Sequence, residues 1–200
     1  MLIEEAMPPS DPCAPITVVT GLPRSGTSMM MQMLGAAGVS ILSDSEREAD
    51  EDNPRGYLEY APVMSLGRDV SWLGEACGRA LKIVTPLLTA LPGEYEYRVI
   101  WMSRDLDEVL ASQQRMLDHS GRSESDGDPV ALRRAFESQL ERVRAELEQR
   151  AIPILNVKYA RAVAEPVAVA REVCDFLGGA LDPTSAASAV DPALYRQRRG

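Results

Sequence analysis

The sequence predicts an α/β fold in which a parallel β-sheet is flanked by helices in a single domain, and three observations lead there. Short β-branched or apolar runs alternate with amphipathic segments of helical period, which is typical of parallel α/β proteins. A tight turn containing glycine joins the first such run to the first helical segment. Hydrophobic residues make up 45% of the 200-residue chain, enough to fill one core.

Four runs predict buried strands because they are short, rich in apolar or β-branched residues, and bounded by turn-forming residues. The first, ITVVT, lies between Pro15 and Gly21, and the third has the sequence RVIWM. In chain order, we expect strands at residues 16–20, 81–84, 98–102 and 152–157.

The intervening segments predict helices, most of them through apolar residues that recur every three or four positions. Pro129 suits the first position of the longest helix, and Gly178 with Gly179 can end the last one. Two polar stretches, residues 40–53 and 121–128, are expected to form loops. In chain order, we expect helices at residues 27–37, 61–77, 106–117, 129–150 and 166–177.

The sequence contains no internal repeat and no sign of a second domain. We expect residues 1–15 to form a flexible lead, residues 16–190 the folded domain, and residues 191–200 a basic tail. The lead carries acids where a signal peptide has Lys or Arg, and no apolar run reaches the roughly 18 residues of a membrane span. These features predict a protein with no membrane partner.

Charge and cysteine content narrow the classes of function. The net charge of −9 argues against a general nucleic-acid binder, whose affinity depends on Lys and Arg that neutralise phosphates. A few well-placed arginines can still bind a small anion in an acidic protein. Because the chain has an odd number of cysteines and no CxxC pair, we expect Cys13, Cys77 and Cys174 to be free thiols in a reducing cytoplasm. Together with one histidine, they do not form a zinc-binding pattern.

The strongest local signal is the segment GLPRSGTS at residues 21–28, between the first strand and the first helix. In that position, backbone N–H groups and the helix dipole converge on an anion, so the segment predicts a phosphate-binding loop. It resembles the Walker pattern GxxxxGK[ST], except that Thr27 stands at the lysine position and Arg24 brings a cation earlier in the loop. An ordinary strand-to-helix turn is the alternative.

A second candidate pair follows the third strand. Arg104 comes directly after that strand, and Ser112 lies eight residues later in the next helix. The separation corresponds to roughly 12 Å along a helix, so both side chains reach one phosphate only if Arg104 folds back over the first turns or the phosphate lies along the helix. Taken alone, the pair is a weak signal, because an arginine at a strand end is usually a surface cap.

Together these motifs resemble a known family. The loop GLPRSGTS is similar to the 5′-phosphosulfate loop of the PAPS-dependent sulfotransferases, where PAPS is 3′-phosphoadenosine 5′-phosphosulfate. Arg104 and Ser112 have the spacing of that family's 3′-phosphate-binding Arg and Ser. The order of a basic strand with a downstream Leu-Pro, a tyrosine after a later strand, and a helix that ends in Phe-Leu-Gly also matches. The similarity spans about residues 16–178.

The resemblance implies a small bacterial-type sulfotransferase with a P-loop NTPase-like fold. Such a protein moves a sulfuryl group from PAPS to a hydroxyl or amine, and it requires no metal because fixed cations can stabilise the leaving phosphate. The acceptor, a small molecule or a glycan, cannot be identified from the sequence. The sequence is compatible with a homo-oligomer.

The resemblance also assigns roles to residues. Arg24 and Lys82 would stabilise negative charge on the leaving phosphate. Tyr159 would lie near the adenine, with a role as a core tyrosine as the alternative. The residues implied to bind the donor are Arg24, Ser25, Gly26, Thr27, Ser28, Arg104, Ser112 and Tyr159.

A general base must take the proton of the acceptor. The family's histidine position has no counterpart here, and His119 is expected at the end of a helix, where it would cap the dipole or face solvent. A carboxylate after the first helix is the next choice, as in other sulfotransferase branches. Glu46 is favoured over Glu59, and a solvated acidic surface is the alternative for this stretch.

Two other functions stay open from the sequence. A P-loop phosphotransferase or nucleotide hydrolase would need the missing loop lysine and an acid for Mg²⁺ at a strand end, for which Asp105 is the nearest candidate. A nucleotide-binding protein without catalysis is the third possibility, because the base is not determined.

Overall fold

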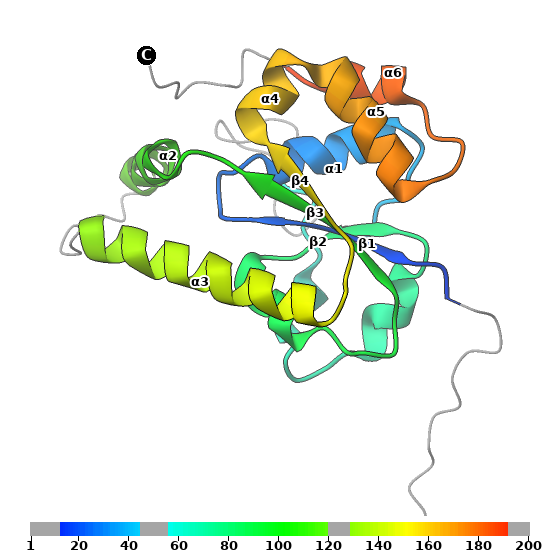
Figure 1. Cartoon of the computed structure of the whole chain (residues 1–200), viewed down its shortest axis with the longest axis horizontal. Coiled ribbons are helices and arrows are strands. Elements are labelled where there is room, and N and C mark those ends of the chain that lie inside the picture. The colour runs from blue at the N-terminus through cyan, green and yellow to red at the C-terminus, as the bar shows by residue number, and fades with distance from the viewer. Residues whose placement is uncertain (1–12, 45–55, 120–128, 192–200) are drawn as a thin grey trace, which may run out of the picture.

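Four strands form one parallel sheet within the described part of the chain. The computed structural model describes residues 13–44, 56–119 and 129–191. The strand order is β2-β1-β3-β4, with β1 (Ile16–Gly21) and β3 (Tyr97–Ser103) in the middle and β2 (Ala80–Lys82) and β4 (Ile154–Lys158) at the sides (Figure 1). All neighbouring strands run parallel, so the predicted α/β class with a parallel sheet is confirmed.

Helices cover both faces of this sheet. The α-helices are α1 (Thr27–Ala36), α2 (Leu106–His119), α3 (Pro129–Gln149), α4 (Tyr159–Ala164), α5 (Pro166–Leu177) and α6 (Pro183–Ser188). The 3₁₀ helices are η1 (Ala61–Ser65), η2 (Ser71–Ala76) and η3 (Thr85–Ala90). Figure 1 shows α1, α4, α5 and α6 on one side of the sheet and α3 on the other, where it contacts η3.

The period-two alternation of the strands divides the core between the two faces. Ile16 and Val18 of β1 pack with η1, η2, η3 and α3, whereas Val19 packs with α1, α5 and α6. In β3, Val99 and Ile100 divide in the same way. Because both faces are buried, the central strands consist of nearly continuous apolar residues, as their sequences predicted.

The strand register determines where the loops that follow the strands meet. Gly21 at the end of β1 pairs with Met102 in β3, and Ser103 pairs with Lys158 at the end of β4. Val19 pairs with Lys82 at the end of β2. The carboxyl ends of all four described strands therefore lie along one edge of the sheet, the edge where α/β proteins bind ligands.

The predicted helix at residues 61–77 is wrong. The structure has two short 3₁₀ helices there, η1 and η2, because Asp69 interrupts the segment. The Asp69 carboxylate accepts a hydrogen bond from the Ser71 N–H at 3.0 Å, and the Asp69 carbonyl accepts one from the Trp72 indole at 3.0 Å. Local hydrogen bonds of this kind compete with the helical pattern.

Two short helices, α4 and α6, were not predicted. The sequence does contain a helix-start signal for α6. Pro183 occupies its first turn, and Asp182 caps it by accepting a hydrogen bond from the Thr184 N–H at 2.9 Å. The other predicted strands and helices are confirmed to within a few residues.

Two cysteines form a disulfide that the sequence did not predict. Cys13 and Cys77 are bonded, with their Cα atoms 5.3 Å apart. They lie side by side because the segments before β1 and β2 are adjacent, where the Gly78 N–H donates to the Ala14 carbonyl at 3.0 Å. The expectation of free thiols is wrong for this pair and holds for Cys174, which is buried and unbonded. Because disulfides are rare in a reducing cytoplasm, this pair no longer supports the prediction of a reducing compartment.

Several predictions concern residues that the description does not cover. The predicted loop at 121–128 lies outside it, as do the lead up to residue 12 and the tail from residue 192. Among the helices of the described ranges, none combines the length and apolar composition needed to cross a membrane.

Reduction of the Cys13–Cys77 disulfide should lower the free energy of unfolding by about 4 kcal/mol, because a crosslink restricts the unfolded chain and this one spans 64 residues. Denaturant unfolding with and without reductant measures the difference. The Cys13→Ser variant is the control: it should match the reduced wild type and show no response to reductant. Equal stability of the oxidised and reduced wild type would contradict this prediction.

Candidate functional site

The loop between β1 and α1 forms the centre of the candidate site. Gly26 is the N-cap residue of α1 and has φ 94°, a conformation that glycine adopts without strain. Its carbonyl accepts the first helical hydrogen bond from the Met30 N–H at 3.1 Å. Within the described residues, no side chain caps this end of α1, and its first turn has no acid. The N–H groups of the first turn are therefore available to an anion, and the phosphate-binding role of this loop stays a prediction.

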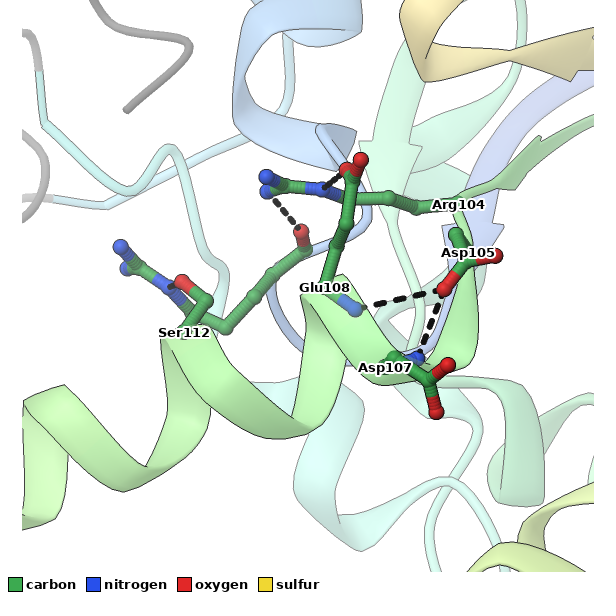
Figure 2. A network of polar contacts seen from close by, with 6 residues as sticks. Arg104, Asp105, Asp107, Glu108 and Ser112 are labelled. Atoms are coloured by element: carbon green, nitrogen blue, oxygen red, sulfur yellow. Dashed lines mark hydrogen bonds and ion pairs between the residues drawn. The ribbon is translucent and has the colours of Figure 1, made fainter. Parts of the chain in front are cut away.

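Arg24 links this loop to helix α2. Its Nε donates to the Ser112 hydroxyl at 3.0 Å, and its backbone carbonyl accepts a hydrogen bond from Nη1 of Arg104 at 3.1 Å. Arg24 also has φ 68°, which is unfavourable for a residue with a side chain. The structure thus joins Arg24 to Arg104 and Ser112, which lie 80 and 88 residues later in the chain. Figure 2 shows Arg104 just before α2 and Ser112 within it.

Two further contacts hold the Arg104 guanidinium, one with Glu108 and one with the Tyr159 ring. Its Nε lies 2.8 Å from Oε2 of Glu108, and the two side chains are only 7% and 9% exposed. Its guanidinium carbon lies 4.7 Å from the centroid of the Tyr159 ring, a cation–π distance. Glu108 was not identified from the sequence, although an arginine followed four residues later by a glutamate at the start of a helix is a recognisable pair.

Asp105 is the candidate Mg²⁺ ligand in the nucleotide-hydrolase alternative, but in the structure its carboxylate accepts hydrogen bonds from the start of α2. Its Oδ1 accepts the N–H groups of Asp107 at 2.9 Å and Glu108 at 3.4 Å, as Figure 2 shows. These contacts satisfy N–H groups in the first turn of α2. In the described ranges, no three His, Cys, Asp or Glu side chains are grouped as metal ligands.

Lys82 forms a second charged group at the end of β2. Its side chain is 8% exposed, and its Nζ lies 3.1 Å from Oε1 of Glu59, which is 42% exposed. The ammonium also donates to the Tyr57 carbonyl and, at 3.4 Å, to the Ser28 hydroxyl. Because Ser28 lies in the first turn of α1, Lys82 and Glu59 lie beside the loop between β1 and α1. Tyr57 was not identified from the sequence.

Tyr159 begins α4 directly after β4 and packs beneath the loop. It is buried, and a Cβ added to Gly26 would lie 2.4 Å from Cδ2 of its ring. The ring therefore occupies the space that a side chain at Gly26 would need. This contact explains the glycine, while a contact between Tyr159 and an adenine stays a prediction.

Ser25 has a buried hydroxyl that has no hydrogen-bond partner among the described residues. A buried polar group without a partner is costly and rare, so this hydroxyl can accept a bond from, or donate one to, a molecule in the loop. Thr27 begins α1 next to it. Glu46, the favoured base, lies outside the described residues, and His119 is the last residue of α2.

Replacement of Gly26 by alanine should destabilise the fold more than replacement of Gly38, which has nearly the same φ, 98° against 94°. In both variants, the left-handed backbone conformation lowers the stability by about 1–2 kcal/mol. Only Gly26→Ala also meets the Tyr159 ring, since no atom of the described residues lies within 4 Å of a Cβ at Gly38. Overpacking adds about 1–3 kcal/mol, measurable by denaturant unfolding. Equal destabilisation by the two substitutions would show that the ring does not restrict the loop.

The sequence profile described as "Sulfotransferase family" matches residues 63–183, which include Lys82, Arg104, Ser112 and Tyr159 but not the loop before them. A search of curated proteins found no match.

Two solved structures share the fold. The sulfotransferase domain from the Synechococcus PCC 7002 olefin synthase is 19% identical with a TM-score of 0.55, covering 96% of this chain and 90% of that one. Sulfotransferase STF9 from Mycobacterium avium is 14% identical with a TM-score of 0.54, covering 94% of this chain and 70% of its own. At these identities the likeness concerns the fold alone, which is the P-loop NTPase-like sulfotransferase fold. Because the family profile matches more than half of its residues, this chain belongs to the sulfotransferase family.

Proposed function

We propose that this protein transfers a sulfuryl group from PAPS to a hydroxyl or amine of an acceptor. The observation that carries the proposal is the hydrogen-bonded group of Arg24, Arg104 and Ser112. It joins a phosphate loop that lacks the Walker lysine to the pair implied to bind a 3′-phosphate. A donor with one anionic group at its 5′ end and another at its 3′ position matches both parts.

The residues present fit such a donor. Among the described residues, the first turn of α1 has no side-chain cap and the buried Ser25 hydroxyl has no hydrogen-bond partner. Both features suit the oxygens of a 5′-phosphosulfate, with the Thr27 and Ser28 hydroxyls adjacent. Guanidinium groups suit phosphate through charge-assisted hydrogen bonds, so Arg104 with Ser112 would hold the 3′-phosphate. Tyr159 would contact the adenosine side of the site.

PAPS, when bound, supplies a sulfuryl group on a phosphate leaving group. The chain's part in the reaction is to position the reactants and stabilise charge, as in phosphoryl transfer. Arg24 and the buried Lys82 are the cations that would stabilise negative charge developing on the leaving phosphate. Because a sulfuryl group carries less charge than a phosphoryl group, we propose that these side chains suffice without a metal.

Of the two candidate bases, Glu59 is the one that lies within the described residues. Its carboxylate contacts Lys82 at 3.1 Å and is 42% exposed, so it is both held at the site and accessible to an acceptor. A base must come within hydrogen-bond distance of the proton that it takes. Glu46 remains the rival candidate, and the acceptor, a small molecule or a glycan, remains open in this proposal.

A nucleotide hydrolase or phosphotransferase is less well supported. Thr27 stands where such a protein has the lysine that reaches the β- and γ-phosphates. Asp105, its nearest Mg²⁺ candidate, accepts two N–H groups of α2. No observation specifically favours this alternative.

The wild type should bind 3′-phosphoadenosine 5′-phosphate (PAP) without Mg²⁺ and prefer it to 5′-AMP. At a hundredfold excess over Kd, PAP should add about 2.7 kcal/mol to the stability. The Arg104→Ala variant should lose most of the preference for PAP, since a charge-assisted contact to the 3′-phosphate disappears. Calorimetric titration with each nucleotide measures both effects.

Arg133→Ala is the matched control, because Arg133 also pairs with a glutamate four residues later but is 40% exposed. It should leave the preference unchanged. Stabilisation by ATP with Mg²⁺ and none by PAP would overturn the proposed function. An unchanged preference in Arg104→Ala would remove only the assignment of Arg104.

Glu59→Gln should lower turnover about 10²–10⁴-fold with PAP affinity retained, because the variant loses the base but keeps the residues that hold the nucleotide. Sulfate transfer from PAPS to a panel of hydroxyl and amine acceptors measures turnover. Glu94→Gln, an exposed glutamate before the amino end of β3, serves as the control. Full turnover in Glu59→Gln with loss in Glu46→Gln would assign the base to Glu46, and full turnover in both would remove the carboxylate proposal.

A further inference from the structure

The position of Glu108 beside Arg104 needs an explanation other than neutralisation of the arginine's charge. The carboxylate of Glu108 lies 2.8 Å from the arginine that is proposed to bind a phosphate, and both side chains are less than 10% exposed. A negative charge in this place opposes the binding of an anion. Burial of two charges is also costly, and such pairs are often no more stabilising than apolar residues. Neither anion attraction nor stability therefore accounts for Glu108.

The contacts around Arg104 show what the carboxylate does. Glu108 engages Nε on one edge of the guanidinium, the Arg24 carbonyl accepts from Nη1 at 3.1 Å, and the Tyr159 ring lies 4.7 Å from the guanidinium carbon. Contacts at Nε, at Nη1 and on the face define both the plane and the direction of the group. A planar donor gives specific phosphate recognition only when its orientation is defined.

Glu108 itself occupies a defined position. It lies in the first turn of α2, where Oδ1 of Asp105 accepts the N–H groups of both Asp107 and Glu108 (Figure 2). Figure 2 also shows the Glu108 side chain extending from the helix toward Arg104. The helix start thus places the carboxylate, and the carboxylate places the guanidinium.

We propose that Glu108 is a positioning residue. It holds the Arg104 guanidinium in the orientation that meets the Arg24 carbonyl in the phosphate loop and presents the group to the 3′-phosphate of the donor. This inference rests on the proposed function. It assigns the role to the length and hydrogen-bonding capacity of the side chain rather than to its charge.

Two substitutions separate geometry from charge. Glu108→Gln keeps the length and an oxygen that can accept from Nε but removes the charge. Glu108→Asp keeps the charge but shortens the side chain by one methylene, so that it no longer spans the distance to Nε. Glu137→Asp is the control for shortening, because Glu137 pairs with Arg133 at the same four-residue spacing and is 47% exposed.

The measurement is the ratio of dissociation constants for 5′-AMP and PAP, obtained by calorimetry, with thermal unfolding of each variant. We expect the ratio in Glu108→Gln to stay within about threefold of the wild type or to rise. In Glu108→Asp it should fall about tenfold or more, the size of a lost charge-assisted hydrogen bond. The Glu137→Asp ratio should match the wild type.

The other outcomes overturn the proposal. A wild-type ratio in Glu108→Asp, with or without a loss of stability, would reduce Glu108 to a structural residue. An equal fall in Glu108→Gln and Glu108→Asp would show that the charge is required as well as the length, which contradicts an assignment to geometry alone. If the wild type itself does not prefer PAP to 5′-AMP, the proposed function fails and this inference fails with it. That result differs from one in which the wild type prefers PAP and both Glu108 variants keep the preference, which overturns only this inference.

Discussion

The parallel pairing of β1 with both β2 and β3 is the constraint on which the rest of this structure depends. It brings the loop after β1 between the ends of two other strands, so that Lys82 lies on one side and Arg104 on the other. A slip of one residue in either pairing would turn the side chains of that strand to the opposite face and separate these groups. Burial of both faces of β1 makes such a slip costly, because Val18 and Val19 belong to the clusters on opposite faces.

At this edge, the cations also support the backbone around the site. Lys82 donates to the Tyr57 carbonyl, and Arg104 donates to the carbonyl of Arg24, a residue with unfavourable φ. Each cation therefore holds a loop while presenting positive charge beside the α1 N-terminus. Placed in this way, a few cations concentrate positive charge locally even in a chain with a net charge of −9. Substitution of either cation is expected to affect loop position as well as charge.

The two carboxylates at the site have different surroundings. Glu59 is 42% exposed beside Lys82, whereas Glu108 is 9% exposed beside Arg104. An exposed carboxylate can exchange protons with an acceptor, but a buried one that is committed to an arginine is suited to orientation. The difference in burial is the physical reason for assigning chemistry to one and positioning to the other.

The sequence by itself determined the local features. The apolar runs that became β1 and β3 and the glycine turn with Arg24 and Gly26 follow from short-range patterns of period and turn chemistry. The pair of Arg104 and Ser112 was a weak signal alone and was identified through the resemblance to a known family. The sequence did not determine that Arg24 joins that pair, that Glu59 contacts Lys82, or that Tyr159 packs against Gly26. Nor could it pair Cys13 with Cys77, which are 64 residues apart. These contacts depend on which strands are neighbours and in what register, and that is decided by burial of the whole sheet rather than by any local segment.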